Sequence, residues 1–321
     1  MKNKEYFSIK FQDDKFIFLD QTKLPLEEVY VETDDYERIA LAIERLEVRG
    51  APAIGITAAY GLTLSLKNAG RSSEDEIFRK AYKRLSSTRP TAVNLFMALN
   101  EIKTTYEKNK SAENIYETVL NKAKEIHQDD IEKCRRIGEN GLAIFKKKSN
   151  ILTHCNTGKL ATGGDGTAFN VIKVGYENNL VNFVYADETR PLLQGLRLTS
   201  FELERSGIPF AIQTDSMANV LMQQSKVDFV IVGADRIALN GDTANKIGTC
   251  SLAVLCNYYN IPFYVAAPTT TIDKKIASGS EIEIEYRNKN EILKINGSPV
   301  APDYYDTFSP AFDVTPSHLI T

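Results

Sequence analysis

Five short and almost continuously apolar runs follow residue 150 and alternate with stretches of helical periodicity. A strand that is apolar on both faces is typical of a parallel sheet covered by helices on both sides. This alternation predicts a Rossmann-like α/β domain with a mainly parallel sheet over residues 146–321. The runs are ILTHC, NFVYAD, FAIQTD, VDFVIVGAD and PFYVAAP, and helices are expected at about 166–175, 191–206, 216–224 and 246–259.

Residues 1–145 show a different pattern. Apolar and polar positions alternate over residues 5–31 around two turn-like stretches, Asp13-Asp14 and Lys23-Leu24-Pro25, which predicts a small antiparallel sheet. Helical spacing follows and predicts a mostly helical N-terminal domain. The first helix is expected after a cap at Asp34 or Asp35, with Ile39, Ile43 and Leu46 on one face, and further helices at about 53–67, 74–86, 91–108 and 113–147.

The composition excludes several kinds of partner. Lys plus Arg is 39 and Asp plus Glu is 42, so the formal net charge of −3 favours neither nucleic acid nor an anionic membrane. No segment approaches the roughly 20 apolar residues of a membrane span. The cysteines and histidines lack the spacing of a disulfide framework or a structural zinc site. We therefore expect a cytoplasmic protein with reduced thiols and no metal; the cysteines are Cys134, Cys155, Cys250 and Cys256, and the histidines are His127, His154 and His318.

The residues at the carboxyl ends of the apolar runs are informative, and at four of the five ends they are polar. Ligands of open α/β sheets bind outside these ends, so the residues there should line one crevice. They are His154-Cys155-Asn156, Asp187-Glu188-Thr189-Arg190, Thr214-Asp215, Asp235-Arg236 and Ala267-Pro268.

The stretch THCNTGKLATGGDGTA, residues 153–168, combines a strand end with a glycine-rich loop. It departs from a dinucleotide fingerprint, because Phe169 stands where a third glycine is needed and the loop is too long for a tight first turn. The glycines are better suited to let backbone N–H groups approach an anion at a helix that starts near Thr167.

Cys155 admits two interpretations. A free cysteine is usually a small buried apolar residue. At the carboxyl end of a strand, however, loop N–H groups could stabilise its thiolate. Adjacent strand residues point to opposite faces, so His154 is expected to be structural rather than a partner of the thiol.

Asp235 also admits two interpretations, which position alone divides evenly. It follows the apolar run VDFVIV and could cap the next helix or pair with Arg236. It could instead be a carboxyl in an apolar pocket, where a raised pKa keeps it protonated as a general acid.

Two arginines each stand just before a helix start that is marked by proline. Arg49 lies in VRGAPAIG and Arg89 in STRPTAVN. A guanidinium beside free helix N–H groups suits a phosphate, although each motif could be a plain helix entry. The polar segment NGDTANKIG, residues 240–248, makes a shared phosphate site credible.

Eight ordered motifs between Val48 and Pro316 closely resemble the methylthioribose-1-phosphate isomerases. That family is grouped with the regulatory α, β and δ subunits of the eukaryotic initiation factor 2B complex. The motifs are VRGAPAIG, STRPTAVNL, THCNTGKLATGGDGTA, ADETRPLLQGLRLT, VDFVIVGADRI, NGDTANKIGT, PFYVAAP and PAFDVTP.

The resemblance implies a helical domain, a Rossmann-like domain, a homodimer, and a small sugar phosphate as substrate with no metal or organic cofactor. Carried over by motif, the catalytic pair falls on Cys155 and Asp235. The implied substrate contacts are Arg49, Gly50, Ala51, Arg89, Gln194, Asn245 and Lys246.

The implied reaction is the conversion of 5-methylthioribose 1-phosphate to its ketose in methionine salvage. Three alternatives stay open: the same chemistry on 5-deoxyribose 1-phosphate, the isomerisation of ribose 1,5-bisphosphate, which needs a second cationic cluster, and a regulatory module without catalysis. The presence of both Cys155 and Asp235 argues against the last.

Overall fold

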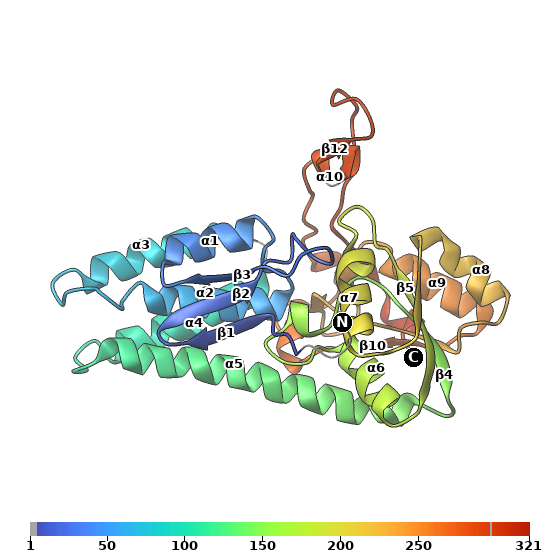
Figure 1. The fold of residues 1–321 in the computed structure, drawn as a ribbon, viewed down its shortest axis with the longest axis horizontal. Helices are drawn as coiled ribbons and strands as arrows, with labels where there is room; N and C mark the ends of the chain where they lie inside the picture. The colour runs from blue at the N-terminus through green and yellow to red at the C-terminus, as the bar shows by residue number, and fades with distance from the viewer. Residues whose placement is uncertain (1–4, 91, 296) are drawn as a thin grey trace. The chain divides into compact units, whose positions relative to one another are not determined.

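The structure, a computed structural model, describes residues 5–90, 92–295 and 297–321. The described residues form two compact units (Figure 1). The helical unit contains residues 5–136 and 158–166, and the α/β unit contains residues 137–157 and 167–321. The glycine-rich segment 158–166 therefore packs with the helical unit, although it links two elements of the α/β unit. The expected division into domains of residues 1–145 and 146–321 stays a prediction.

The small antiparallel sheet predicted for the helical unit is confirmed. Its order is β1 (Ile9–Gln12), β2 (Lys15–Leu19) and β3 (Tyr30–Thr33). Asp13 and Asp14 both have positive φ angles, 51° and 54°, which match the twist of a two-residue hairpin turn.

The helices predicted for this unit are present. α1 (Tyr36–Glu44) begins after Asp35, whose carboxylate accepts a 2.9 Å hydrogen bond from the Glu37 N–H. α2 (Ala51–Leu64) is apolar around its whole circumference and is buried from Ala53 to Leu64, so it forms the centre of this unit. The remaining helices are α3 (Glu74–Ser86), α4 (Val93–Lys108) and α5 (Ile115–Asn140), followed by the 3-10 turn η1 (Gly141–Ile144).

The α/β unit contains the predicted parallel sheet, with the strand order β10-β7-β4-β5-β6. Alternate residues of β4 and β7 contribute to separate cores on the two faces, which α6 and α7 cover on one side and α8 and α9 on the other. The fold prediction is thus confirmed. The strands are β4 (Ser149–Thr153), β5 (Val181–Asp187), β6 (Phe210–Gln213), β7 (Phe229–Val232) and β10 (Phe263–Val265), and the helices are α6 (Ala168–Glu177), α7 (Ser200–Arg205), α8 (Ala218–Gln223) and α9 (Thr249–Tyr259).

The strand order reverses at β4. From β4 the chain proceeds outward through β5 to β6, and then returns to add β7 and β10 on the opposite side of β4. In an open α/β sheet such a reversal creates a crevice outside the carboxyl ends of the two strands that flank it. These strands are β4 and β7.

A second, antiparallel sheet was not predicted. Its order is β13 (Phe312–Thr315), β9 (Thr243–Lys246) and β8 (Arg236–Ile237). The helix expected from residue 246 therefore begins later, at Thr249, because the preceding residues pair with β13.

An arm of α10 (Asn290–Leu293), β11 (Lys294–Ile295) and β12 (Ser298–Pro299) projects from the rest of the α/β unit (Figure 1). Short turns complete the chain. They are η2 (Lys159–Ala161), η4 (Asp215–Met217), η5 (Thr269–Thr271), η6 (Gly279–Glu281) and η7 (Ser317–Leu319), together with the π-helical η3 (Gly195–Thr199).

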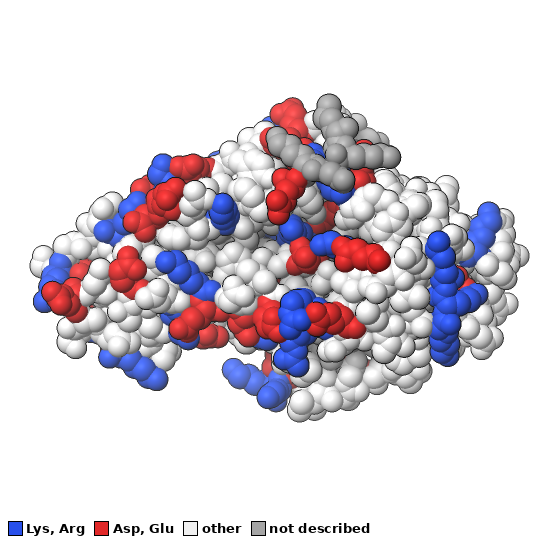
Figure 2. All heavy atoms as spheres, turned by 60° about the horizontal axis from the view of Figure 1, so that its bottom comes forward, with Lys and Arg blue, Asp and Glu red and all other residues white. Residues whose placement is uncertain are grey.

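Charged side chains of both signs are interspersed over the face shown in Figure 2, as the net charge of −3 leads one to expect. Within the described residues, no helix has the length and apolar character needed to cross a membrane.

Candidate active site

Cys155 occupies a constrained position two residues after the end of β4. Its φ angle is 63°, in the left-handed region that side chains other than glycine rarely adopt. Two threonine hydroxyls hold its peptide groups: the Cys155 N–H donates to Thr189 Oγ1 at 2.8 Å, and Thr199 Oγ1 donates to the Cys155 carbonyl at 2.5 Å. Strained backbone that is held this firmly is typical of functional sites.

We call the two contacts of Thr189 and Thr199 with the Cys155 peptide groups the threonine clamp. Thr189 is itself held by Asp215. The Asp215 carboxylate accepts the N–H groups of Thr189 at 2.8 Å and Arg190 at 3.0 Å. Thr189 also has a positive φ angle, 62°, and its hydroxyl donates to the Asp187 carbonyl at 3.0 Å. The loop after β5 thus fixes the backbone on which the thiol is carried.

Asp235 follows β7, the strand next to β4 at the reversal. Its N–H donates to the Ala244 carbonyl on β9 at 2.9 Å. Arg236 Nε lies 3.8 Å from Asp273 Oδ2, so this arginine has a counterion other than Asp235.

The carboxyl ends of β4 and β7 lie in close contact. A Cβ atom added at Gly233 would lie 2.8 Å from Thr157 Cγ2, a distance that real Cβ atoms do not tolerate. Gly233 is two residues before Asp235, and Thr157 is two residues after Cys155. The structure therefore brings the backbone around the two predicted catalytic residues together.

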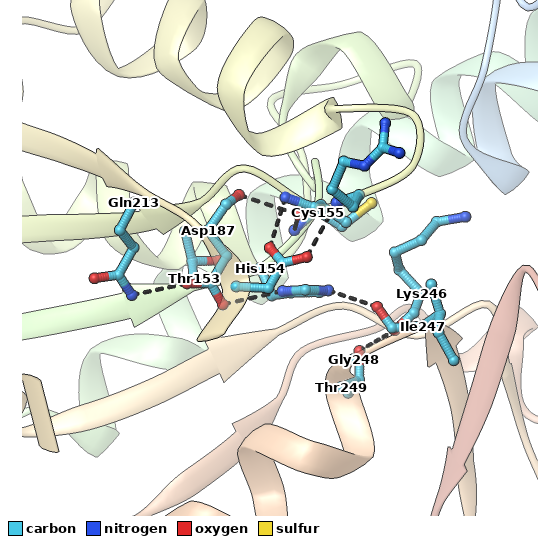
Figure 3. A network of polar contacts seen from close by, with 12 residues as sticks. Thr153, His154, Cys155, Asp187, Gln213, Lys246, Ile247, Gly248 and Thr249 are labelled. Atoms are coloured by element: carbon cyan, nitrogen blue, oxygen red, sulfur yellow. Dashed lines mark hydrogen bonds and ion pairs between the residues drawn. The ribbon is translucent and has the colours of Figure 1, made fainter. Parts of the chain in front are cut away.

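Asn245 and Lys246 end β9 with buried side chains. Asn245 Nδ2 donates to Thr249 Oγ1 at 3.0 Å. Lys246 Nζ donates to the Ala311 carbonyl at 3.1 Å and lies 4.7 Å from the centre of the Phe312 ring. The side chains of Lys246 and Cys155 point to the same side of the polar network in Figure 3.

Gln194 immediately precedes the π-helical turn η3, an irregularity that occurs often at functional sites. Its Oε1 atom is buried and has no hydrogen-bond partner among the described residues. Since a buried acceptor that stays unsatisfied is costly, Oε1 is suited to receive a hydrogen bond from a ligand hydroxyl.

His154, Asp187 and Gln213 form a buried chain of polar contacts (Figure 3). His154 Nδ1 lies 3.0 Å from Asp187 Oδ2, and Gln213 Nε2 donates to Asp187 Oδ1 at 2.8 Å. Burial alone would lower the pKa of His154, but the hydrogen bond and charge of Asp187 outweigh it and raise that pKa. Burial raises the pKa of Asp187.

His154, Asp187 and Asp215 are residue types that often bind metals, but their ligand atoms are already engaged in hydrogen bonds. Ligand atoms of His154, Asp187 and Asp215 lie within 4.8 Å of one another. Each carboxylate oxygen already accepts a hydrogen bond, and both ring nitrogens of His154 are also engaged. The residues therefore fit a hydrogen-bond network better than a cation.

The remaining predicted contacts lie in the helical unit. Gly50 precedes α2 with a φ angle of 91°, and a Cβ there would lie 2.4 Å from the Ala161 carbonyl oxygen, so only glycine fits. Ala51 is the first residue of α2, Arg49 is buried, and Arg89 lies half-buried between α3 and α4. Thr91, within the same motif, lies outside the described residues.

Some of the backbone N–H groups expected to bind an anion at the helix start near Thr167 are already hydrogen-bonded within the chain. α6 begins at Ala168, and the N–H groups of Thr167 and Phe169 both donate to Thr157, at 2.7 and 3.0 Å. These two amides are therefore used within the chain, and the cationic side chains are the better candidates to hold a phosphate.

Sequence reasoning missed the threonine clamp and the histidine–aspartate contact. Asp187, Thr189 and Asp215 were expected only to line the crevice. Their position at strand ends was the available signal, whereas the positive φ angle of Cys155 that makes a clamp necessary has no local sequence pattern.

Comparison with known proteins identifies the family. The family model described as "Initiation factor 2 subunit family" matches residues 47–321. The chain belongs to that family. It is 50% identical over 317 residues to a methylthioribose-1-phosphate isomerase of Caldicellulosiruptor saccharolyticus, covering 97% of this chain and 92% of the relative.

Two solved structures cover 99% of this chain. The 5-methylthioribose 1-phosphate isomerase of Pyrococcus horikoshii OT3 superposes with a TM-score of 0.93 at 40% identity, and 90% of that chain is covered. A structure titled as the translation initiation factor eIF-2B, subunit delta, from A. fulgidus gives a TM-score of 0.88 at 39% identity, with 93% of that chain covered. The fold is thus shared by proteins whose names indicate an enzyme and a translation factor.

Proposed function

We propose that this chain is an aldose–ketose isomerase that converts 5-methylthioribose 1-phosphate to 5-methylthioribulose 1-phosphate in methionine salvage. The observation that carries the proposal is the position of Cys155, two residues after β4, and of Asp235, three residues after β7, because the sheet order reverses between these two strands. Relatives at about half identity that bear the isomerase name support it.

The substrate imposes a specific chemical problem. Its C1 carries a phosphate, so the ring cannot open spontaneously to a free aldehyde. Isomerisation needs a proton on the ring oxygen as the C1–oxygen bond breaks, and a hydrogen must move from C2 to C1. C1 is then reduced, and C2 is oxidised to the ketone.

Asp235 is our acid for the ring oxygen. Cys155 either removes the proton from C2 or stabilises the charge that develops there.

Arg49, Arg89 and Lys246 are proposed to hold the phosphate, and Gly50 and Ala51 to approach it through their backbone at the start of α2. Gln194 and Asn245 would bind substrate hydroxyls. The buried and unsatisfied Oε1 of Gln194 supports its part, since a hydroxyl can only meet that atom as a donor.

We also propose a cytoplasmic homodimer. The segments that flank the arm of the α/β unit expose Tyr286, Tyr304, Tyr305 and Phe308, with Phe308 77% exposed. Two pairs of these rings are in contact, Tyr286 with Phe308 and Tyr304 with Tyr305. Exposed clusters of aromatic residues are typical of a protein interface. Sedimentation should give twice the mass of the 35.9 kDa chain. A monomer at micromolar concentration would overturn this part alone.

A regulatory subunit is the second candidate, because the A. fulgidus relative has an initiation-factor title at 39% identity. The two functions differ in one measurable property. An isomerase turns over its sugar phosphate, whereas a regulatory subunit only binds a ligand or a partner protein.

The decisive experiment incubates the purified protein with 5-methylthioribose 1-phosphate and follows ketose formation by NMR. 5-Deoxyribose 1-phosphate and ribose 1,5-bisphosphate serve as parallel substrates. We expect turnover that is fastest with the methylthio sugar and absent in the Cys155→Ala variant. Absence of turnover with all three sugars would reject the enzyme in favour of the regulatory subunit.

A further inference from the structure

We propose that His154 and Asp187 are a positioning pair that holds the thiol-bearing end of β4 and the lysine-bearing end of β9 in one fixed arrangement. The inference rests on the proposed function, in which Cys155 and Lys246 act on the same substrate. It gives His154 a role beyond filling the core.

The His154 ring connects three segments. Nδ1 lies 3.0 Å from Asp187 Oδ2 at the end of β5, and Nε2 lies 2.8 Å from the Ile247 carbonyl oxygen directly after β9. His154 precedes Cys155 by one residue, and Ile247 follows Lys246 by one residue. A single imidazole ring thus joins the backbone beside the thiol to the backbone beside the ammonium (Figure 3).

The contacts of the ring determine where its protons lie. A carbonyl oxygen can only accept, so Nε2 must carry a hydrogen. One further proton is then shared between Nδ1 and Asp187 Oδ2, as an imidazolium and a carboxylate or as a neutral pair. Asp187, with this shared proton, lets His154 make both contacts at once.

The pair is fully enclosed. His154 is 1% exposed and Asp187 is 0% exposed. Gly248 lies against the ring, and a Cβ atom at that glycine would come within 3.0 Å of His154 Cε1. A side chain so confined can transmit a displacement of β4 to the end of β9.

Three acidic groups act on His154 within the described residues. Asp187 and Asp215 come from the ends of β5 and β6, and both stabilise the protonated ring. Asp313, on β13, also interacts with the His154 charge and accepts the N–H groups of Gly248 and Cys250 at 2.8 and 3.1 Å. All three carboxylates favour protonation of the ring.

Two substitutions separate the two contacts. The His154→Asn amide can replace Nδ1 and reach Asp187, but it is too short to reach the Ile247 carbonyl. The His154→Gln amide can replace Nε2 and reach Ile247, but it leaves Asp187 without its partner. We expect His154→Asn to raise KM for 5-methylthioribose 1-phosphate by about tenfold, and His154→Gln to keep KM within about threefold while it lowers the thermal midpoint.

Thr153→Val is the matched control. Thr153 lies beside His154 on β4 and donates a buried 2.8 Å hydrogen bond to the Ile231 carbonyl, but it has no link to β9. This variant should lose stability and keep the wild-type kcat and KM. If His154→Asn behaves like this control, the histidine is merely structural and the proposal fails.

Asp187→Asn and Asp187→Leu provide a second readout. The asparagine amide can donate to Nδ1 of a neutral ring that keeps its hydrogen on Nε2, so both contacts of His154 persist and KM should stay within about threefold of the wild type. Leucine leaves Nδ1 without a partner, so the ring is no longer held toward the Ile247 carbonyl and KM should rise by about tenfold. Equal KM values for the two variants would overturn the inference, whereas a wild-type protein without isomerase activity would reject the proposed function instead.

Discussion

The strand ends of the α/β unit and the arginine motifs of the helical unit differ in how their backbone is held. Cys155 sits on strained backbone that two threonine hydroxyls hold. Arg49 and Arg89 instead stand shortly before the first residues of α2 and α4. In the proposed function, the reacting groups need fixed backbone, whereas phosphate recognition needs mainly charge and reach. Substitutions in the two regions should therefore change different kinetic constants.

The largest effect is expected for Cys155→Ala. It should lower kcat by about 10³-fold or more and leave the fold and substrate binding nearly intact, because the small side chain contributes more chemistry than packing. Steady-state kinetics with calorimetric binding will separate the two. Cys250→Ala, on α9, is the control and should keep wild-type activity. A Cys155→Ala enzyme with normal kcat would make the thiol structural.

Asp235→Asn should rank next. It preserves the shape of the side chain and removes the acid, so binding should persist while turnover falls by roughly 10²-fold, the usual scale of general acid catalysis. Asp228→Asn, just before the start of β7, is the matched control; its carboxylate accepts the Asn150 N–H at 2.7 Å. Lost binding with an unaltered rate at saturation would recast Asp235 as a hydroxyl ligand.

Arg89→Ala should act mainly through substrate binding. Loss of a charged hydrogen bond to the phosphate should lower kcat/KM by about 2 kcal/mol, or roughly 30-fold. Arg84→Ala is the control in the neighbouring helix α3, because Arg84 pairs with Glu37 and Glu44 instead. Equal kcat/KM for wild type and Arg89→Ala would remove Arg89 from the phosphate site.

Thr199→Val should give the smallest change. It keeps the shape of the side chain but removes the donor to the Cys155 carbonyl, which is worth about 1 kcal/mol. We expect kcat to fall about fivefold with KM unchanged, which would show that backbone clamping matters at the strand ends. A change in KM alone would place Thr199 with the binding residues and weaken the comparison.

The sequence was informative where burial leaves a local pattern. The five strands are apolar on both faces, so their runs identified the parallel sheet and, through its carboxyl ends, the position of Cys155 and Asp235. Gln194 came from the family resemblance alone. Arg49 and the segment that contains Lys246 were already suggested by position as parts of a phosphate site, and the resemblance gave them their individual roles.

The sequence was uninformative where distant segments determine the conformation. Thr243–Lys246 is polar and alternates weakly, and it becomes strand β9 by pairing with β13, which lies about seventy residues later. The clamp on Cys155 likewise depends on Thr189 and Thr199, which a different part of the chain supplies. The local periodicity of the sequence does not indicate which distant segments pair.

Alkylation tests the central claim, that the reaction takes place at the thiol after β4, most directly. The protein is treated with iodoacetamide at pH 8, with and without 5-methylthioribose 1-phosphate, and the modified thiols are located by mass spectrometry while activity is followed. Burial raises the pKa of Cys134 and Cys256 to about 12, so both should stay neutral and unmodified. The account predicts that activity falls in proportion to modification of Cys155. It also predicts that the substrate slows both the modification of Cys155 and the loss of activity. Full activity after complete alkylation of Cys155 would contradict it.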